Sequence, residues 1–168
     1  MKFSTKQVSR GAVIAALYAA MCFLLEPISY GSMQFRISEV LTVLPIFMPE
    51  AVIGLFIGCV IANALGGASI AILDMVLGSL TTLCAAILTR AIYKKTKSVF
   101  LALIPPVILN ALIVGSYVPF LYSDPGSVTT LPIVLISMLS VGIGQAAVIY
   151  ILGVPLGKAL LKTRLFSN

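Results

Sequence analysis

The chain has 168 residues, of which 60% are hydrophobic and 10% are charged, and its net charge is +6 at pH 7. A soluble domain carries about 25% charged residues, so this composition predicts one integral membrane domain over residues 1–168 with most of its surface in lipid. The basic residues stand at the ends of apolar runs, which favours a role in membrane topology over nucleic-acid binding.

The first predicted span covers residues 8–25 and is led by Lys2, Lys6 and Arg10. At about 1.5 Å per residue, a helix of this length crosses a hydrocarbon core of about 30 Å. No small-residue cleavage site follows the run, so we expect a retained first span and not a signal peptide.

Small residues form a stripe on this first span, where Ala12, Ala16 and Ala20 recur every four residues. Such a smooth face lets another helix approach closely. The partner could be a helix of this chain or a separate protein, and the sequence favours neither.

Residues 29–39 (SYGSMQFRISE) form a polar segment between two apolar blocks and contain Gln34, Arg36 and Glu39. Arg36 is the one basic residue that falls on the outer side in the topology described below. We interpret this segment as the lid and part of the lining of a binding site for a small planar ligand.

The apolar stretch 39–65 is interpreted as two spans, at about 39–48 and 51–65. A single crossing would place the loop at residues 94–97, which is rich in lysine, on the side opposite to the basic N-terminus. The positive-inside rule disfavours that arrangement. Two crossings, or a re-entrant hairpin, bring both basic segments to the same side.

The break between these two spans is assigned to Pro45 and Pro49, with Glu50 beside them. As an α-helix, the segment 39–48 would cover only about 15 Å, half of the hydrocarbon core. Its end groups would lack partners in lipid, so we predict that neighbouring helices or a wet cavity shield it.

Three further spans are predicted at about 70–93, 99–118 and 133–156, and the pair Pro105-Pro106 is expected to kink the second of them. Ten of the eleven basic residues then lie on the inner side, with Arg36 as the exception. The predicted fold is therefore all-α, with six transmembrane helices, a short second helix and both termini cytoplasmic.

The polar residues in or beside the spans are the candidate ligand contacts, because polar groups are costly in a membrane. They are Tyr30, Gln34, Arg36, Glu39, Asn63, Asp74, Asn110, Tyr117 and Gln145. The two acceptor oxygens of Glu39 match two adjacent N–H donors, such as those on the Watson–Crick edge of a guanine-like ring. The two tyrosines are candidates for stacking on the ring face.

Each of these residues also has a simpler interpretation. Glu39 could cap its own helix or pair with Arg36. Asn63, Asn110 and Gln145 could join helices by hydrogen bonds worth about 0.6–2 kcal/mol each. Gln34 could be a hydrated loop residue. The tyrosines could belong to an interfacial aromatic belt, and Asp74 could be a carboxylate at a helix N-terminus.

Enzymatic chemistry is disfavoured, since the sequence has no His, no P-loop motif for ATP and no metal-binding group of carboxylates. Cys22, Cys59 and Cys84 lack metal-ligand spacing and are interpreted as small buried hydrophobes. We therefore expect a binding protein with no cofactor and no metal, which depends on another protein for energy.

Three segments, SYGSMQFRISEVLTVLP, PEAVIGLFIGCVIAN and LDMVLGSLTTL, together resemble the QueT-like queuosine-precursor transporters. Members of that family are substrate-binding S components of energy-coupling factor (ECF) transporters. The resemblance covers about residues 8–160, and its most specific part is the QFRISE segment. It implies a multi-pass protein of a bacterial plasma membrane, with six helices, an outer pocket and a lid between the first two helices.

The resemblance also implies partners and ligands. The partners are a transmembrane T component and two cytoplasmic ATPases, with Ala12, Ala16 and Ala20 as the coupling face. The ligands are deazapurines, namely 7-cyano- or 7-aminomethyl-7-deazaguanine or queuine. An S component for another vitamin, a stand-alone secondary carrier and a structural subunit remain the alternatives.

Overall fold

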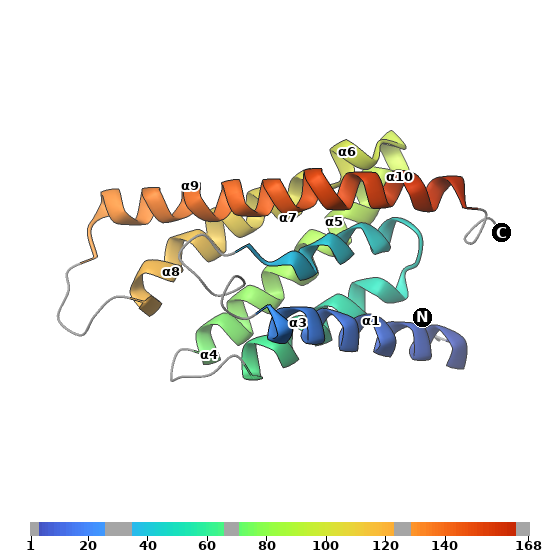
Figure 1. Cartoon of the computed structure of the whole chain (residues 1–168), viewed down its shortest axis with the longest axis horizontal. Helices are drawn as coiled ribbons and strands as arrows, with labels where there is room; N and C mark the ends of the chain where they lie inside the picture. Colours follow the sequence, from blue (N-terminus) through green and yellow to red (C-terminus); the bar gives the residue numbers. More distant parts are fainter. Residues whose placement is uncertain (1–3, 26–34, 66–70, 123–128, 164–168) are drawn as a thin grey trace.

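The computed structural model describes residues 4–25, 35–65, 71–122 and 129–163, and within these ranges it contains helices and no β-strand (Figure 1). This confirms the all-α prediction. The elements in chain order are α1 (Thr5–Leu24), the 3₁₀ helix η1 (Ile37–Ile46), α3 (Glu50–Leu65), α4 (Ala71–Leu73), η2 (Asp74–Gly78), α5 (Ser79–Thr96), α6 (Val99–Ala102), α7 (Ile104–Leu109), η3 (Asn110–Val114), α8 (Gly115–Tyr122), α9 (Leu131–Val148), η4 (Ile149–Gly153) and α10 (Val154–Lys162).

Four helical stretches in the described ranges are long and apolar enough to cross a membrane: Thr5–Leu24, Asp74–Thr96, Val99–Leu121 and Leu131–Lys162. The helices η1 and α3 are apolar but shorter. The first turns of α1 and the last turns of α10 lie at the same end of the molecule (Figure 1). These features are those of an integral membrane protein, and the count of six spans with cytoplasmic termini stays a prediction.

The short second helix is a 3₁₀ helix, not the α-helix that the sequence predicted. A 3₁₀ helix rises about 2.0 Å per residue, so η1 covers about 20 Å and not about 15 Å. It packs against α1, α3, α5, α9 and α10, and Figure 1 shows it between α9 and the α1–α3 pair. These neighbours bury its side chains, as expected for so short a helix.

The end of η1 is held by a residue on α5. The Nη1 atom of Arg90 donates a hydrogen bond of 2.8 Å to the carbonyl oxygen of Pro45. A charged donor here satisfies one of the carbonyl groups that a helix end leaves without an intrahelical partner. The chain then turns at residues 47–49, and α3 begins at Glu50.

The most extensive contact between two helices in the described ranges lies between α1 and α3. Ile14, Ala15 and Tyr18 face α3 and are buried. A Cβ atom added at Gly58 would lie 2.8 Å from the carbonyl oxygen of Ala15 and 2.8 Å from the Cβ of Tyr18. A Cβ added at Gly54 would lie 2.6 Å from the carbonyl oxygen of Gly11, so the missing side chains at Gly54 and Gly58 together allow the close approach of α1 and α3, and Gly58 does so beside Tyr18.

We expect Gly58→Ala to lower the free energy of unfolding by about 1–3 kcal/mol, because α1 must move away from α3 to admit the methyl group. The measurement is the midpoint of thermal unfolding of the purified protein in detergent. Gly153→Ala is the matched control, since the nearest heavy atom to its added Cβ is 3.7 Å away, an ordinary contact. Equal midpoints for the two variants would show that Gly58 does not limit the helix separation.

Candidate functional site

Seven buried side chains from six separate parts of the chain form two hydrogen-bonded groups, both of which include a residue of η1 or its N-cap, and we call them together the polar cluster. Its members are Tyr18 (α1), Arg36 (the N-cap of η1), Glu39 (η1), Asn63 (α3), Asp74 (η2), Tyr117 (α8) and Gln145 (α9). None is more than 7% exposed. The cluster therefore joins the described helices across the interior, and η1 supplies both the cation and one of the two carboxylates.

Glu39 is the centre of one half of the cluster. The hydroxyl of Tyr18 donates a hydrogen bond of 2.5 Å to Oε1. The side-chain amide of Gln145 donates one of 3.0 Å to Oε2. Both oxygens thus accept hydrogen bonds from neutral donors.

Asp74 is the centre of the other half. Its Oδ2 lies 2.8 Å from Nη2 of Arg36, in a buried ion pair. Its Oδ1 accepts a 2.5 Å hydrogen bond from the hydroxyl of Tyr117. Its backbone carbonyl accepts one of 2.9 Å from Asn63 Nδ2. Asp74 is therefore held by three helices besides its own.

Asp74 opens the π-helical segment η2, a wider turn that occurs frequently at functional sites. Gly78 closes this segment, and a Cβ added there would lie 2.8 Å from Asp74 Oδ1, 3.1 Å from the hydroxyl of Tyr117 and 3.2 Å from Nδ2 of Asn63. The absence of a side chain at Gly78 lets these three polar atoms from three helices close over the backbone of η2.

Two thiols border the cluster. Cys22 Sγ lies 3.0 Å from the hydroxyl of Ser38. Cys59 Sγ accepts hydrogen bonds from Thr82 and Asn63 at 3.4 and 3.5 Å. Both cysteines are buried, as the sequence predicted, but the prediction was wrong for Cys84, which is exposed on α5. Helix rotation, which hydropathy alone does not give, decides this difference.

The structure brings together six of the nine predicted ligand contacts, namely Arg36, Glu39, Asn63, Asp74, Tyr117 and Gln145. Asn110 makes no hydrogen bond to the cluster among the described residues; its Nδ2 donates a hydrogen bond of 2.8 Å to the carbonyl oxygen of Pro106, one turn earlier in the same helical stretch. The remaining two, Tyr30 and Gln34, lie outside the described residues.

The structure decides between several of the simpler interpretations that the sequence allowed for these polar residues. Arg36 pairs with Asp74, and Glu39 bonds to other helices although it lies in the first turn of η1. Tyr117 is 7% exposed and bonded to Asp74, which is not the setting of an interfacial belt residue. Asn63 and Gln145 do join helices, and each does so through a carboxylate residue of the cluster.

Tyr18 and Gly78 are cluster residues that sequence reasoning missed. Tyr18 carried a signal, because it has the only hydroxyl in the apolar run 11–25, and a buried tyrosine hydroxyl usually needs a hydrogen-bond partner. Gly78 carried no such signal in the sequence, because its role depends on Asp74, Tyr117 and Asn63, which the fold brings around it from three helices. Within the described ranges, no group of three or more His, Cys, Asp or Glu side chains could hold a metal ion.

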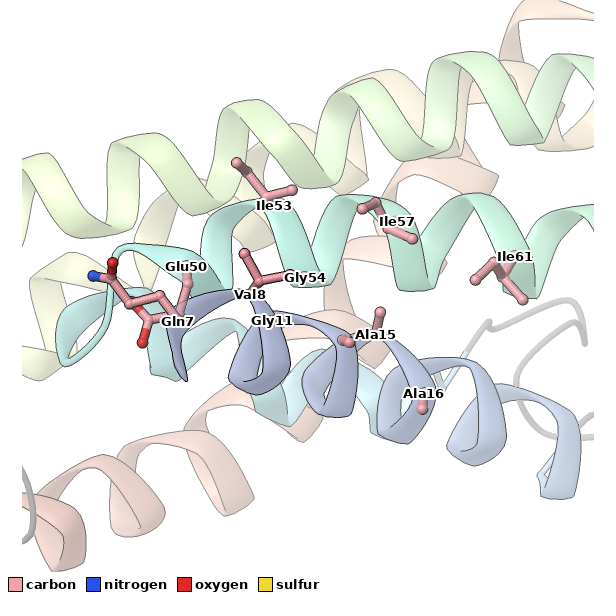
Figure 2. A pocket seen from close by; sticks show the side chains of 11 residues that line it. Gln7, Val8, Gly11, Ala15, Ala16, Glu50, Ile53, Gly54, Ile57 and Ile61 are labelled. Atoms are coloured by element: carbon pink, nitrogen blue, oxygen red, sulfur yellow. The ribbon is translucent and has the colours of Figure 1, made fainter. Parts of the chain in front are cut away.

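A second feature is an apolar groove of about 360 Å³ on the surface between α1 and α3 (Figure 2). Its lining residues are Gln7, Val8, Gly11, Ala12, Ala15, Ala16, Glu50, Ile53, Gly54, Ile57 and Ile61. The stripe residues Ala12, Ala16 and Ala20 are exposed on α1, whereas Ala15 packs against α3. Glu50, at one end of the groove beside Gln7, lies 3.6 Å from Arg10.

The long apolar helices and the buried polar cluster define a helical, multi-pass membrane protein with a polar site in its interior. The family model described as the QueT transporter matches residues 8–162, and the chain belongs to that family. This confirms the resemblance noted in the sequence.

A curated relative named "Queuosine precursor transporter QueT", from Lactococcus lactis subsp. cremoris (strain MG1363), is 38% identical over 84 residues. The match covers 49% of this chain and 48% of the relative, so it spans about half the length of each protein. No solved structure matches the chain.

Proposed function

We propose that the chain is the substrate-binding S component of an ECF-type, ATP-driven importer, and that it captures a queuosine precursor, either a 7-deazaguanine base or queuine. Membership of the QueT family and the name of the relative from Lactococcus lactis support this substrate class. The observation that carries the proposal is the buried Glu39, whose two oxygens both accept hydrogen bonds.

A 7-deazaguanine ring presents an amide N–H beside an exocyclic amine, and a carboxylate accepts from both at once. In the structure, Tyr18 and Gln145 occupy the two acceptor positions of Glu39. Both donors are neutral, so a ligand can replace them without separating an ion pair. Asp74 is the alternative acceptor, but its Oδ2 is paired with Arg36.

The proposed energy source is a transmembrane T component with two cytoplasmic ATPases. Ala12, Ala16 and Ala20 are exposed on α1. In the apolar stretch of α1 only 22% of the residues are buried, compared with 44% in the stretch Val99–Leu121. The adjacent groove is lined by small and branched apolar residues (Figure 2). A small-residue face beside a groove suits close packing of a helix from the T component.

Ligand binding by the purified protein in detergent tests the proposal. We expect 7-deazaguanines to raise the thermal midpoint selectively, because a ligand at 100 times its dissociation constant adds about 2.7 kcal/mol to stability. Guanine, riboflavin and thiamine are the comparison ligands. Stabilisation by a different vitamin would overturn the substrate, and stabilisation by none would favour a stand-alone carrier or a structural subunit.

A further inference from the structure

The groove between α1 and α3 is apolar along most of its length and acidic at one end (Figure 2). The exposed side chains of Ile53, Ile57 and Ile61 line it along α3. At the end beside Gln7, the lining includes Glu50, the first residue of α3. Among the described residues that line the groove, Glu50 is the only charged one. The groove therefore presents a carboxylate at a fixed place on an otherwise apolar surface.

The carboxylate of Glu50 is incompletely bonded. The residue is only 4% exposed, although it lines a surface groove. Its Oε1 lies 3.6 Å from Nη1 of Arg10, which is an ion pair but too long for a hydrogen bond. Its Oε2 is buried and accepts no hydrogen bond from the described part of the chain. Because a buried acceptor without a donor costs free energy, Glu50 can be stabilised by a donor that enters the groove.

The residues next to Glu50 leave the groove side of this carboxylate open. A Cβ added at Gly11 would lie 3.4 Å from the backbone oxygen of Glu50 and 3.9 Å from its Cβ, and both are ordinary contacts. The packing of α1 on α3 therefore tolerates a methyl group at Gly11, and the glycine leaves that space free at the acidic end of the groove. Arg10 does not line the groove, and its side chain is 45% exposed.

We propose that the T-component helix that packs in this groove presents a Lys or Arg side chain to Glu50. Such a side chain donates to the carboxylate and carries the opposite charge, whereas an apolar helix would leave Oε2 without a donor. In the predicted topology Arg10 and its partner Glu50 lie on the inner side, where Lys and Arg are enriched in membrane proteins. This inference rests on the proposed function and adds the charge that the partner helix carries at the level of Glu50.

The test measures the dissociation constant of the full-length chain in detergent for the T component with its two ATPases, all from one organism. Glu50→Gln keeps the shape of the side chain and removes its charge, so we expect this constant to rise at least about tenfold while the affinity for a 7-deazaguanine stays unchanged. Arg10→Gln is the matched control, because it removes the neighbouring charge and keeps the carboxylate, and it should bind the T component no more weakly than the unaltered chain. Equal losses in both variants would mean that the Arg10–Glu50 pair only shapes the groove, and would overturn the inference.

Variants of the T component then locate the cation, and they need no change in this chain. Each Lys and Arg of its transmembrane helices is replaced in turn by Met. At one position the replacement should weaken binding of the unaltered chain at least about tenfold, but weaken binding of Glu50→Gln less than about twofold. Absence of such a position, or a Glu50→Gln chain that binds the T component as tightly as the unaltered chain, would overturn the inference and leave the proposed function intact.

Two further outcomes separate the alternatives. The unaltered chain could retain phosphatidylethanolamine through purification while Glu50→Gln loses this lipid and still binds the T component equally well. That result would assign the groove to a lipid amine and overturn the inference. Failure of the unaltered chain to bind the T component at all would overturn the proposed function itself, and with it the inference.

Discussion

Replacing Asp74 with alanine is expected to lower the free energy of unfolding by about 3–5 kcal/mol, the cost of removing one partner of a buried ion pair. Arg36 is 3% exposed, so its guanidinium would lose its carboxylate in a place that bulk water does not reach. Tyr117 and Asn63 are bonded to the same residue, and the Tyr117 bond would be lost too. At about 2–4 °C per kcal/mol for a chain of this length, the thermal midpoint should fall by about 6–20 °C.

Two further variants separate the charge from the packing. Tyr117→Phe removes one neutral hydrogen bond to Asp74 and should cost only about 1 kcal/mol. The double variant Arg36→Met with Asp74→Leu removes both charges and should recover most of the loss, because apolar replacement of a buried pair is often neutral or stabilising. A double variant as unstable as Asp74→Ala would mean that the ion pair is not the cause.

Substituting Gln for Glu39 is expected to weaken the binding of a 7-deazaguanine by more than tenfold. The amide keeps one acceptor oxygen and replaces the other with a donor, so one of the two N–H groups of the ligand would face another N–H group. Tyr18 and Gln145 would still contact residue 39, because the change preserves its shape. Isothermal titration of the purified variant measures the affinity, and its thermal midpoint without ligand checks that it is folded.

Glu50→Gln is the matched control for this variant. Glu50 is also a buried carboxylate at 4% exposure, but it lies at the start of α3 beside Arg10 and lines the apolar groove between α1 and α3. We expect its affinity for the ligand to match that of the unaltered protein. Retained affinity in Glu39→Gln, or an equal loss in both variants, would reject the role of Glu39 in reading the ligand.

Local properties of the chain determined the class of protein and the positions of its helices. Hydropathy and the placement of basic residues predicted helical segments at 8–25, 39–48 and 51–65, and the structure has helices at Thr5–Leu24, Ile37–Ile46 and Glu50–Leu65. Pro49 correctly predicted the break between the second and third helices, because it stands directly before α3. The prediction was wrong for Pro45, which lies within η1. The polar character of most of the site was also evident, because polar residues are rare in this sequence.

Only the tertiary structure decided which polar groups are partners. Arg36 is three residues from Glu39 but pairs with Asp74, 38 residues away, and Glu39 bonds to Gln145 across 106 residues. Sequence spacing predicts neighbours on one helix, whereas these partners depend on how separate helices rotate and approach each other. The same reason explains why sequence reasoning missed Gly78 as a cluster residue. It also explains why Asn110, which was predicted together with Asn63 and Gln145, bonds to the carbonyl of Pro106 and not to the cluster.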